Sequence, residues 1–228
     1  MMYCIPRPAR SLPNAIRNTV IVEVFYPILL AVSAFWLGAC PFSLWIGRWL
    51  LRRDIRDYGD GNPGAANVFR AGGRKSGCLA LVLDITKGVP FVVLAHSFFG
   101  FPGVLVMAVA LSAILGHAFS PLLGLNGGKS IAVTFGVLLA LPQHEMLITF
   151  AIFMFLGFLF MESDVWTAML GPAGSLTYLV ATRGNSWESL FMLCVLVILA
   201  VKHFNELKTV PRFRVRLIHR FRSRGRET

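Results

Sequence analysis

A polar, glycine-rich stretch at residues 58–70 interrupts a chain that is otherwise mostly apolar. Glycines leave backbone N–H groups free to face an anion, and the start of a helix adds partial positive charge. We expect a short helix here, with Asn62 as its N-cap and the glycine pair at 72–73 just beyond its end. Asn67 and Arg70 would then share one face of that helix. The stretch predicts a phosphate-binding loop, with an ordinary interhelical turn as the alternative.

A second glycine motif, Gly127-Gly128-Lys129-Ser130, ends like a nucleotide-binding loop. The first glycine of such a loop would fall on Leu123, and no strand–helix pattern surrounds the motif, so nucleotide binding is not predicted. A lysine beside glycine N–H groups can still bind a phosphate as a point charge. We therefore expect Lys129 to contact a phosphate, with a flexible turn and a snorkelling lysine as the alternative.

The spacing of Gly59, Gly61 and Gly64, with Asp84 twenty residues after Gly64, formally matches a dinucleotide-binding fingerprint. That fingerprint requires a strand before the first glycine, and the charged residues 52–57 are not a strand. In addition, Asp84 lies inside an apolar stretch. Dinucleotide binding is therefore rejected.

Three polar residues lie within apolar stretches. Asp84 and Lys87 are three positions apart, so on a helix they can pair, and we expect Asp84 to brace a neighbouring loop. His117 lies near the end of another apolar stretch, where it could act as a general base or be a buried core histidine. No histidine, cysteine or carboxylate has metal-ligand spacing near it, and the four cysteines are scattered, so neither a metal nor a disulfide framework is predicted.

The elements that carry these residues are membrane-spanning helices. The chain of 228 residues is 56% hydrophobic, with a mean hydropathy of +0.67 and a net charge of +11, which is typical of an all-α integral membrane protein. We predict about seven spans, with five or six as alternatives because the fourth and fifth stretches are short. The first stretch contains Pro41, which predicts a kink. The seven stretches are 25–50, 77–99, 101–123, 131–141, 146–161, 165–182 and 187–204.

The distribution of Lys and Arg predicts how these spans are oriented. With seven spans, the strongly basic loop at 52–76, the loop at 124–130 and the tail after residue 201 lie on one side. The positive-inside rule makes that side cytoplasmic and places the N-terminus outside, although Arg7, Arg10 and Arg17 oppose this orientation. Both glycine-rich loops and the start of the tail would therefore open to the cytoplasm, where they could form one site.

The chain divides into three parts on composition. Residues 1–19 form a polar N-terminal segment, residues 20–208 a transmembrane domain, and residues 209–228 a basic cytoplasmic tail. The tail alternates basic and apolar residues, so we expect it to lie on anionic membrane lipid. Nothing in the sequence requires a nucleic-acid partner, and the sequence leaves the oligomeric state open.

Five motifs, in order along the chain, resemble those of one family, the acyl-phosphate-dependent glycerol-3-phosphate acyltransferases of bacterial membranes. The similarity runs from about residue 38 to residue 208. Residues 59–70 are similar to the family's Gly-Ser-Gly-Asn-x-Gly-Ala-Thr-Asn-Val-x-Arg loop. The other motifs are Gly38-Ala39-Cys40-Pro41-Phe42, Leu83-Asp84-Ile85-Thr86-Lys87-Gly88, Gly116-His117-Ala118-Phe119 with Gly127-Gly128-Lys129, and Lys202-His203.

The resemblance implies a function. Family members transfer a fatty acyl group from acyl phosphate to the 1-hydroxyl of glycerol 3-phosphate, which gives lysophosphatidic acid for phospholipid synthesis. It also implies a multi-pass protein of the bacterial inner membrane that uses no metal or coenzyme. On this basis Arg70 and Lys129 are expected to clamp phosphate, and His117 and His203 to support or share proton transfer. The expected substrate-binding residues are Asp60, Gly61, Asn62, Gly64, Asn67, Gly127, Gly128, Asn205 and Glu206.

The chain departs from the family pattern within these motifs. The loop serine of the family is Asp60 here, whose carboxylate repels phosphate unless Arg70 or Arg56 neutralises it. The departures allow a divergent enzyme or a non-catalytic anion- or lipid-binding paralogue. A small-anion transporter is disfavoured, because the polar motifs gather at one face. The other departures are Ala66 for Thr, Asn126 for Lys, Ser130 for Gly and Glu206 for Asn.

Overall fold

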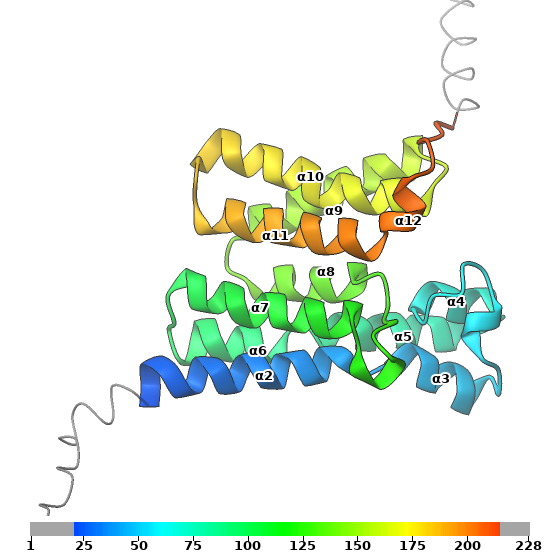
Figure 1. Cartoon of the computed structure of the whole chain (residues 1–228), viewed down its shortest axis with the longest axis horizontal. Coiled ribbons are helices and arrows are strands. Elements are labelled where there is room, and N and C mark those ends of the chain that lie inside the picture. The colour runs from blue at the N-terminus through cyan, green and yellow to red at the C-terminus, as the bar shows by residue number, and fades with distance from the viewer. Residues whose placement is uncertain (1–20, 215–228) are drawn as a thin grey trace, which may run out of the picture.

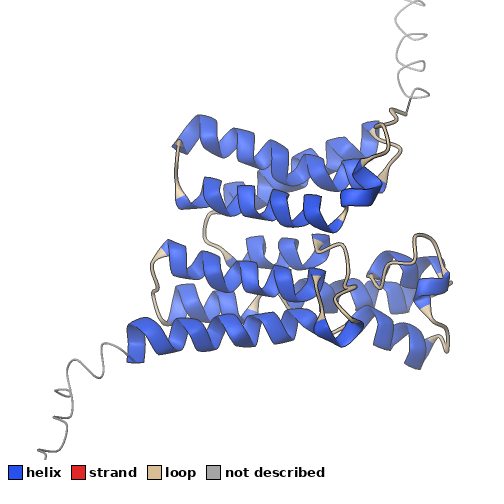
Figure 2. Cartoon of the chain, in the orientation of Figure 1, coloured by secondary structure: helices blue, strands red, loops and turns tan. Residues whose placement is uncertain are grey.

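The computed structural model describes residues 21–214, and every regular element in that part of the chain is helical (Figures 1 and 2). The predicted all-α architecture is therefore confirmed. The polar segment 1–19 and most of the basic tail, residues 215–228, lie outside the described residues.

The first apolar stretch forms two helices rather than one. A π-helical segment, η1 (Ile21–Phe25), leads into α2 (Tyr26–Ala39), and α3 (Phe42–Leu50) follows after a break. The predicted kink is confirmed as this break, because Pro41 has no N–H group to continue the helical hydrogen-bond ladder. The remaining elements are η2 (Ile55–Asp57), α4 (Ala65–Arg70), α5 (Arg74–Thr86), α6 (Pro90–Val93), η3 (Leu94–Phe98), α7 (Gly103–Ala118), η4 (Pro121–Leu123), α8 (Ile131–Ala140), α9 (His144–Phe160), α10 (Asp164–Arg183), α11 (Trp187–Lys202) and α12 (Phe204–Leu207).

A buried ion pair braces the break between α2 and α3. Lys87 Nζ lies 2.8 Å from Asp84 Oδ1 and donates to the Cys40 carbonyl oxygen at 3.0 Å. Ser43 Oγ, in the first turn of α3, donates to Asp84 Oδ2 at 2.5 Å. Both predictions for Asp84, pairing with Lys87 and bracing a neighbouring segment, are therefore confirmed.

Three helical stretches are long and apolar enough to cross a membrane: Glu23–Leu50, Arg74–Phe98 and Gly103–Leu123. They coincide with the first three predicted spans. The next two apolar helices, α8 and α9, are shorter, as the sequence indicated. Helices α10 and α11 occupy the last two predicted stretches within a few residues.

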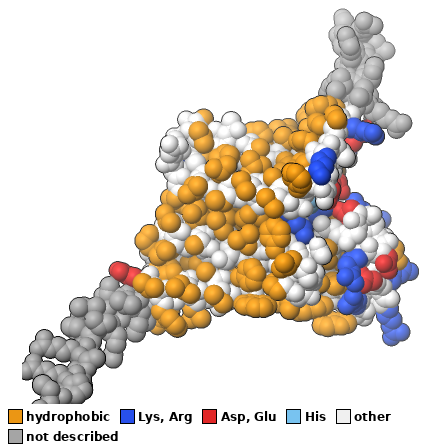
Figure 3. All heavy atoms as spheres, viewed as in Figure 1, with side chains coloured by type: hydrophobic (Ala, Val, Ile, Leu, Met, Phe, Trp, Pro, Cys, Tyr) orange, Lys and Arg blue, Asp and Glu red, His pale blue; other side chains and the backbone are white. Residues whose placement is uncertain are grey.

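The outer surface is that of a protein surrounded by lipid. Large apolar side chains are exposed over the sides of the bundle (Figure 3), a pattern that soluble monomers rarely show over a large continuous area. Lys and Arg side chains gather at the end where α3, α4 and α12 lie. Examples of the exposed apolar side chains are Trp36, Leu139, Ile148, Phe155, Phe158 and Val197.

The bundle has two groups of helices, with the main core between them. Helices α2, α6 and α7 form one group, α9, α10 and α11 the other, and α8 lies between (Figure 1). Large side chains such as Ile114, Leu138, Phe150 and Phe191 fill the core. A smaller cluster around Ile55 supports the glycine-rich segment against α3 and α5.

Close contact between α2 and α7 depends on a glycine. A Cβ atom on Gly116 would overlap the backbone carbonyl oxygen of Phe35, so one helix would have to shift. We expect Gly116→Ala to lower the free energy of unfolding by about 1–3 kcal/mol, because overpacking outweighs the helix propensity gained from alanine. Thermal unfolding in detergent measures this. Ala108→Val, which adds volume at an exposed position of α7, is the matched control. Equal or greater stability of Gly116→Ala would contradict the packing argument.

Candidate active site

A cavity of about 410 Å³ lies between the glycine-rich segment and helices α5, α7, α8, α9 and α10. One end is polar and the rest is mainly apolar. This division matters because it places charged groups next to a wall that suits a hydrocarbon chain. The polar end includes Asp60, Asn62, Asn67, Arg70, Lys129 and Asp164, and the apolar wall includes Leu81, Ile85, Ile131, Phe135 and Met154.

The glycine-rich segment folds differently from the expected N-capped helix. Helix α4 begins at Ala65, its N-cap is Gly64, and no side chain caps it, so the prediction of Asn62 as N-cap is wrong. The physical reason is a local turn: Asp60 Oδ1 accepts a hydrogen bond from the Asn62 backbone N–H at 3.2 Å. Gly61 has a positive φ of 73° within this turn. The turn delays the helix and aims the loop side chains at the cavity.

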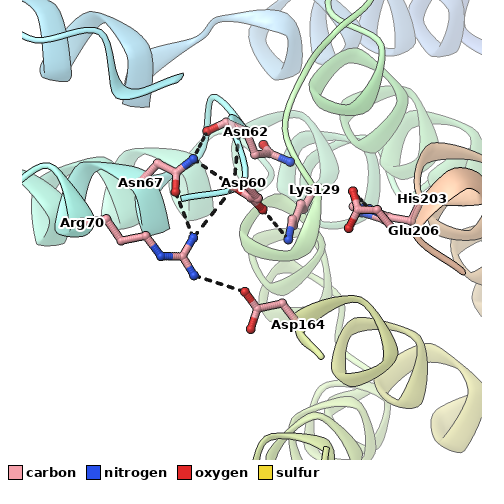
Figure 4. A network of polar contacts seen from close by, with 8 residues as sticks. All are labelled: Asp60, Asn62, Asn67, Arg70, Lys129, Asp164, His203 and Glu206. Carbon is pink, nitrogen blue, oxygen red and sulfur yellow. Dashed lines mark hydrogen bonds and ion pairs between the residues drawn. The ribbon is translucent and has the colours of Figure 1, made fainter. Parts of the chain in front are cut away.

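Asn67 holds this loop in place. Its Nδ2 donates to Asp60 Oδ1 and to the Asn62 carbonyl oxygen, both at 2.9 Å. Its Oδ1 accepts a hydrogen bond from Arg70 Nη1 at 2.9 Å, which confirms that the two residues share one helix face (Figure 4). Asn67 itself is buried, so it orients Arg70 rather than presenting a free group.

The two predicted phosphate-binding cations meet at Asp60. Lys129 Nζ lies 2.6 Å from Asp60 Oδ2, and Arg70 Nη1 lies 3.8 Å from Asp60 Oδ1 (Figure 4). The structure thus brings together two loops that the sequence separates. Lys129 lies closer to the Asp60 carboxylate than Arg70 does, so it contributes more to neutralising that charge. Arg56 pairs with Asp54 instead.

The charge state of Asp60 follows from these contacts. Burial alone would raise its pKa, but the hydrogen bond and charge of Lys129 outweigh burial and lower the pKa to about 2. Because the folded-state pKa is depressed, this contribution to stability is present above the unfolded pKa near 3.9 and is lost as the pH falls towards 2. Asp60 is therefore a carboxylate at neutral pH.

His117 lines the cavity, and the second glycine motif packs behind it. Its side chain is 7% exposed, and its backbone carbonyl oxygen accepts a hydrogen bond from the Gly128 N–H at 3.0 Å. A Cβ on Gly127 or Gly128 would overlap His117 atoms. These glycines are not among the residues that line the cavity, and their small size allows close packing beside Lys129. Their expected substrate contact stays a prediction.

The predicted residues after α11 lie next to the cavity rather than in its lining. His203 is buried, and its Nδ1 lies 3.4 Å from Glu206 Oε1. Its buried Nε2 has no hydrogen-bond partner among residues 21–214. Figure 4 shows His203 and Glu206 on the other side of Lys129 from Arg70. Asn205 is exposed and accepts a hydrogen bond from Lys208 Nζ at 3.1 Å.

Asp164 is a site residue that was not predicted. It begins α10, lines the cavity and pairs with Arg70, with Nη2 and Oδ2 3.2 Å apart. Its partner is 94 positions away, which no local pattern reveals. A usable signal existed nonetheless: with seven spans, the short turn before residue 165 falls on the same side as both glycine-rich loops.

The fold and the cavity define a helical integral membrane protein with a candidate anion site that opens onto an apolar wall. Comparison with known proteins then shows its family. The chain belongs to the glycerol-3-phosphate acyltransferase family, whose model matches residues 28–212. The family resemblance of the sequence motifs is thereby confirmed.

Individual relatives agree with this assignment. A glycerol-3-phosphate acyltransferase of Lactococcus lactis subsp. lactis (strain IL1403) is 32% identical over 190 residues, which are 80% of this chain and 89% of the relative. One of Pelagibacter ubique (strain HTCC1062) is 33% identical over 189 residues, which are 79% and 92%. The crystal structure of PlsY, an integral membrane glycerol 3-phosphate acyltransferase, in its glycerol 3-phosphate form matches with a TM-score of 0.70 and 25% identity, over 80% of this chain and 90% of that one.

Proposed function

We propose that this chain transfers a fatty acyl group to the 1-hydroxyl of glycerol 3-phosphate and so forms lysophosphatidic acid. The observation that carries the proposal is the cavity, which joins Arg70 and Lys129 to an apolar wall in a member of this family. The named activity of its relatives supports the same reaction. The comparisons favour neither a non-catalytic binding protein nor a transporter.

Each end of the cavity suits one part of the substrates. The guanidinium of Arg70 and the ammonium of Lys129 suit a phosphate, because charge-assisted hydrogen bonds to phosphate are strong. The apolar side chains of Leu81, Phe135 and Met154 suit the acyl chain. Acyl phosphate is the proposed donor, since phosphate is a good leaving group and positioning then supplies much of the rate.

In the proposed reaction, the 1-hydroxyl oxygen attacks the acyl carbonyl carbon. A new ester C–O bond forms, the C–O bond to phosphate breaks, and phosphate leaves with the electron pair. Arg70 and Lys129 would stabilise the negative charge on the phosphate groups. His117, which lines the cavity, would accept the hydroxyl proton. His203 would contribute indirectly: it contacts Glu206, and both residues lie beside Lys129 (Figure 4).

We further propose a location and orientation. The protein would span the inner membrane about seven times, with its N-terminus outside and the cavity open to the cytoplasm. The gathering of Lys and Arg at the end with α3, α4 and α12 supports this orientation. The water-soluble acceptor would then reach the polar end from the cytoplasm.

An assay with purified protein in detergent tests the reaction. We expect lysophosphatidic acid and inorganic phosphate from glycerol 3-phosphate and palmitoyl phosphate, and little product from palmitoyl-CoA. Palmitoyl-CoA as the better donor would reject acyl phosphate and keep the transferase. If neither donor gives product under conditions in which the Lactococcus lactis relative is active, the enzymatic proposal fails.

A further inference from the structure

An ion pair at the polar end of the cavity joins the glycine-rich segment to the helix group α9, α10 and α11. It joins Arg70, the last residue of α4, to Asp164, the first residue of α10 (Figure 4). Both residues line the cavity. The contact therefore lies where an entering phosphate would meet Arg70.

The cationic groups of the cavity are balanced before any substrate enters. Lys129 pairs with Asp60, and Arg70 pairs with Asp164 and, more distantly, with Asp60. Among the described residues lining the cavity, no other Lys or Arg is present. A phosphate that takes the place of the carboxylate on Arg70 Nη2 must therefore displace Asp164.

The two carboxylates are held unequally. Asp60 has Lys129, the Asn67 amide and the Asn62 backbone N–H as partners. Asp164 has only Arg70 as a side-chain partner within residues 21–214, and its side chain is 65% exposed against 31% for Asp60. Exposed single ion pairs are weak, so Asp164 is the carboxylate that a phosphate can replace.

The backbone around Asp164 is fixed, so its side chain can exchange alone. The Glu162 N–H donates to the Arg212 carbonyl oxygen at 2.9 Å, and Trp166 Nε1 donates to the Thr209 carbonyl oxygen at 3.1 Å. The start of the tail thus holds residues on both sides of Asp164.

We propose that Asp164 sets the affinity for the acceptor: its carboxylate occupies the phosphate position on Arg70 in the empty site and is displaced by the phosphate of the acceptor. The proposal rests on the proposed function and adds that the chain sets its own acceptor affinity. No covalent bond changes. The Asp164 side chain rotates so that its carboxylate is exposed to solvent, and a phosphate oxygen takes its place on Arg70 Nη2.

The test is Asp164→Asn, which removes the charge and keeps the size and shape of the side chain. We expect the KM for glycerol 3-phosphate to fall roughly three- to tenfold, with the effect on KM rather than kcat. Asp164→Ala should act in the same direction, and Asp164→Glu should restore the wild-type KM. Glu162→Gln is the matched control. It removes one negative charge two residues from Asp164, and the Glu162 side chain makes no ion pair in the described part of the chain.

A binding measurement separates this inference from the proposed function. Isothermal titration calorimetry with inorganic phosphate requires no turnover. If Asp164→Asn binds phosphate three- to tenfold tighter while no variant forms product, the inference holds and the proposed function fails. If product forms but Asp164→Asn and Glu162→Gln share the wild-type phosphate affinity and KM, the inference is overturned.

Discussion

Alanine in place of Lys129 is expected to lower kcat/KM for acyl transfer by about 100- to 1,000-fold, the range found when one preorganised stabilising group is lost. The reason is twofold. The site would lose the charge that we propose binds the substrate phosphate, and Asp60 would lose its partner at 2.6 Å. The carboxylate, left with only the more distant Arg70 as an ionic partner, would then repel phosphate inside a partly buried cavity. Initial rates of lysophosphatidic acid formation at several glycerol 3-phosphate concentrations measure the effect.

The double variant Lys129→Ala/Asp60→Ser separates these two causes. It removes the repelling carboxylate as well, so we expect it to recover about tenfold of the lost activity, since a pair in contact is not additive. Lys75→Ala is the control, because Lys75 is exposed at the start of α5 and outside the cavity lining. If Lys129→Ala stays within threefold of the wild type, Lys129 is not a phosphate clamp.

The second large effect concerns folding rather than chemistry. We expect Lys87→Ala to lower the free energy of unfolding by about 3–5 kcal/mol, because it leaves the Asp84 carboxylate buried without its cation. Asp84 is 2% exposed and Lys87 3% exposed, so water cannot take the place of the missing partner. The loss should also loosen the break at Cys40, whose carbonyl oxygen Lys87 binds. Denaturation in detergent, followed by helical circular dichroism, reports the change.

Removing both charges is the informative comparison. Asp84→Asn/Lys87→Met deletes the pair together, and such replacements of buried pairs cost far less than removal of one partner. We expect the double variant to recover at least half of the free energy of unfolding that Lys87→Ala loses. Lys208→Ala, at an exposed lysine, should match the wild type. A double variant as unstable as Lys87→Ala would show that shape, rather than charge, holds this region.

Local patterns predicted the features that depend on local spacing. Hydropathy over about twenty residues found the three long spans, because a bilayer imposes that length. Helical periodicity placed Asn67 beside Arg70 and Asp84 beside Lys87, because residues three apart are neighbours on a helix. The uneven distribution of Lys and Arg predicted that both glycine-rich loops lie at the same end of the bundle, and the structure has them there.

Features that depend on contacts across the fold were not predicted. The Asp60 side chain turns the loop before α4, so a cap rule applied to Asn62 alone failed. Gly127 and Gly128 resemble a phosphate cradle in sequence, and the structure adds that their small size allows close packing against His117. The pairing of Arg70 with Asp164 forms only when the end of α4 lies beside the start of α10.

The apolar wall of the cavity reaches Leu81, a residue of α5 that is 39% exposed. A donor whose chain lies along this wall need never leave the bilayer. Its supply then depends on its mole fraction in the plane of the membrane, whereas the acceptor arrives from bulk water. Adding inert lipid would dilute one substrate and leave the other unchanged. The rate of such a protein would depend on the surface concentration of the donor in the membrane and on the bulk concentration of the acceptor in water.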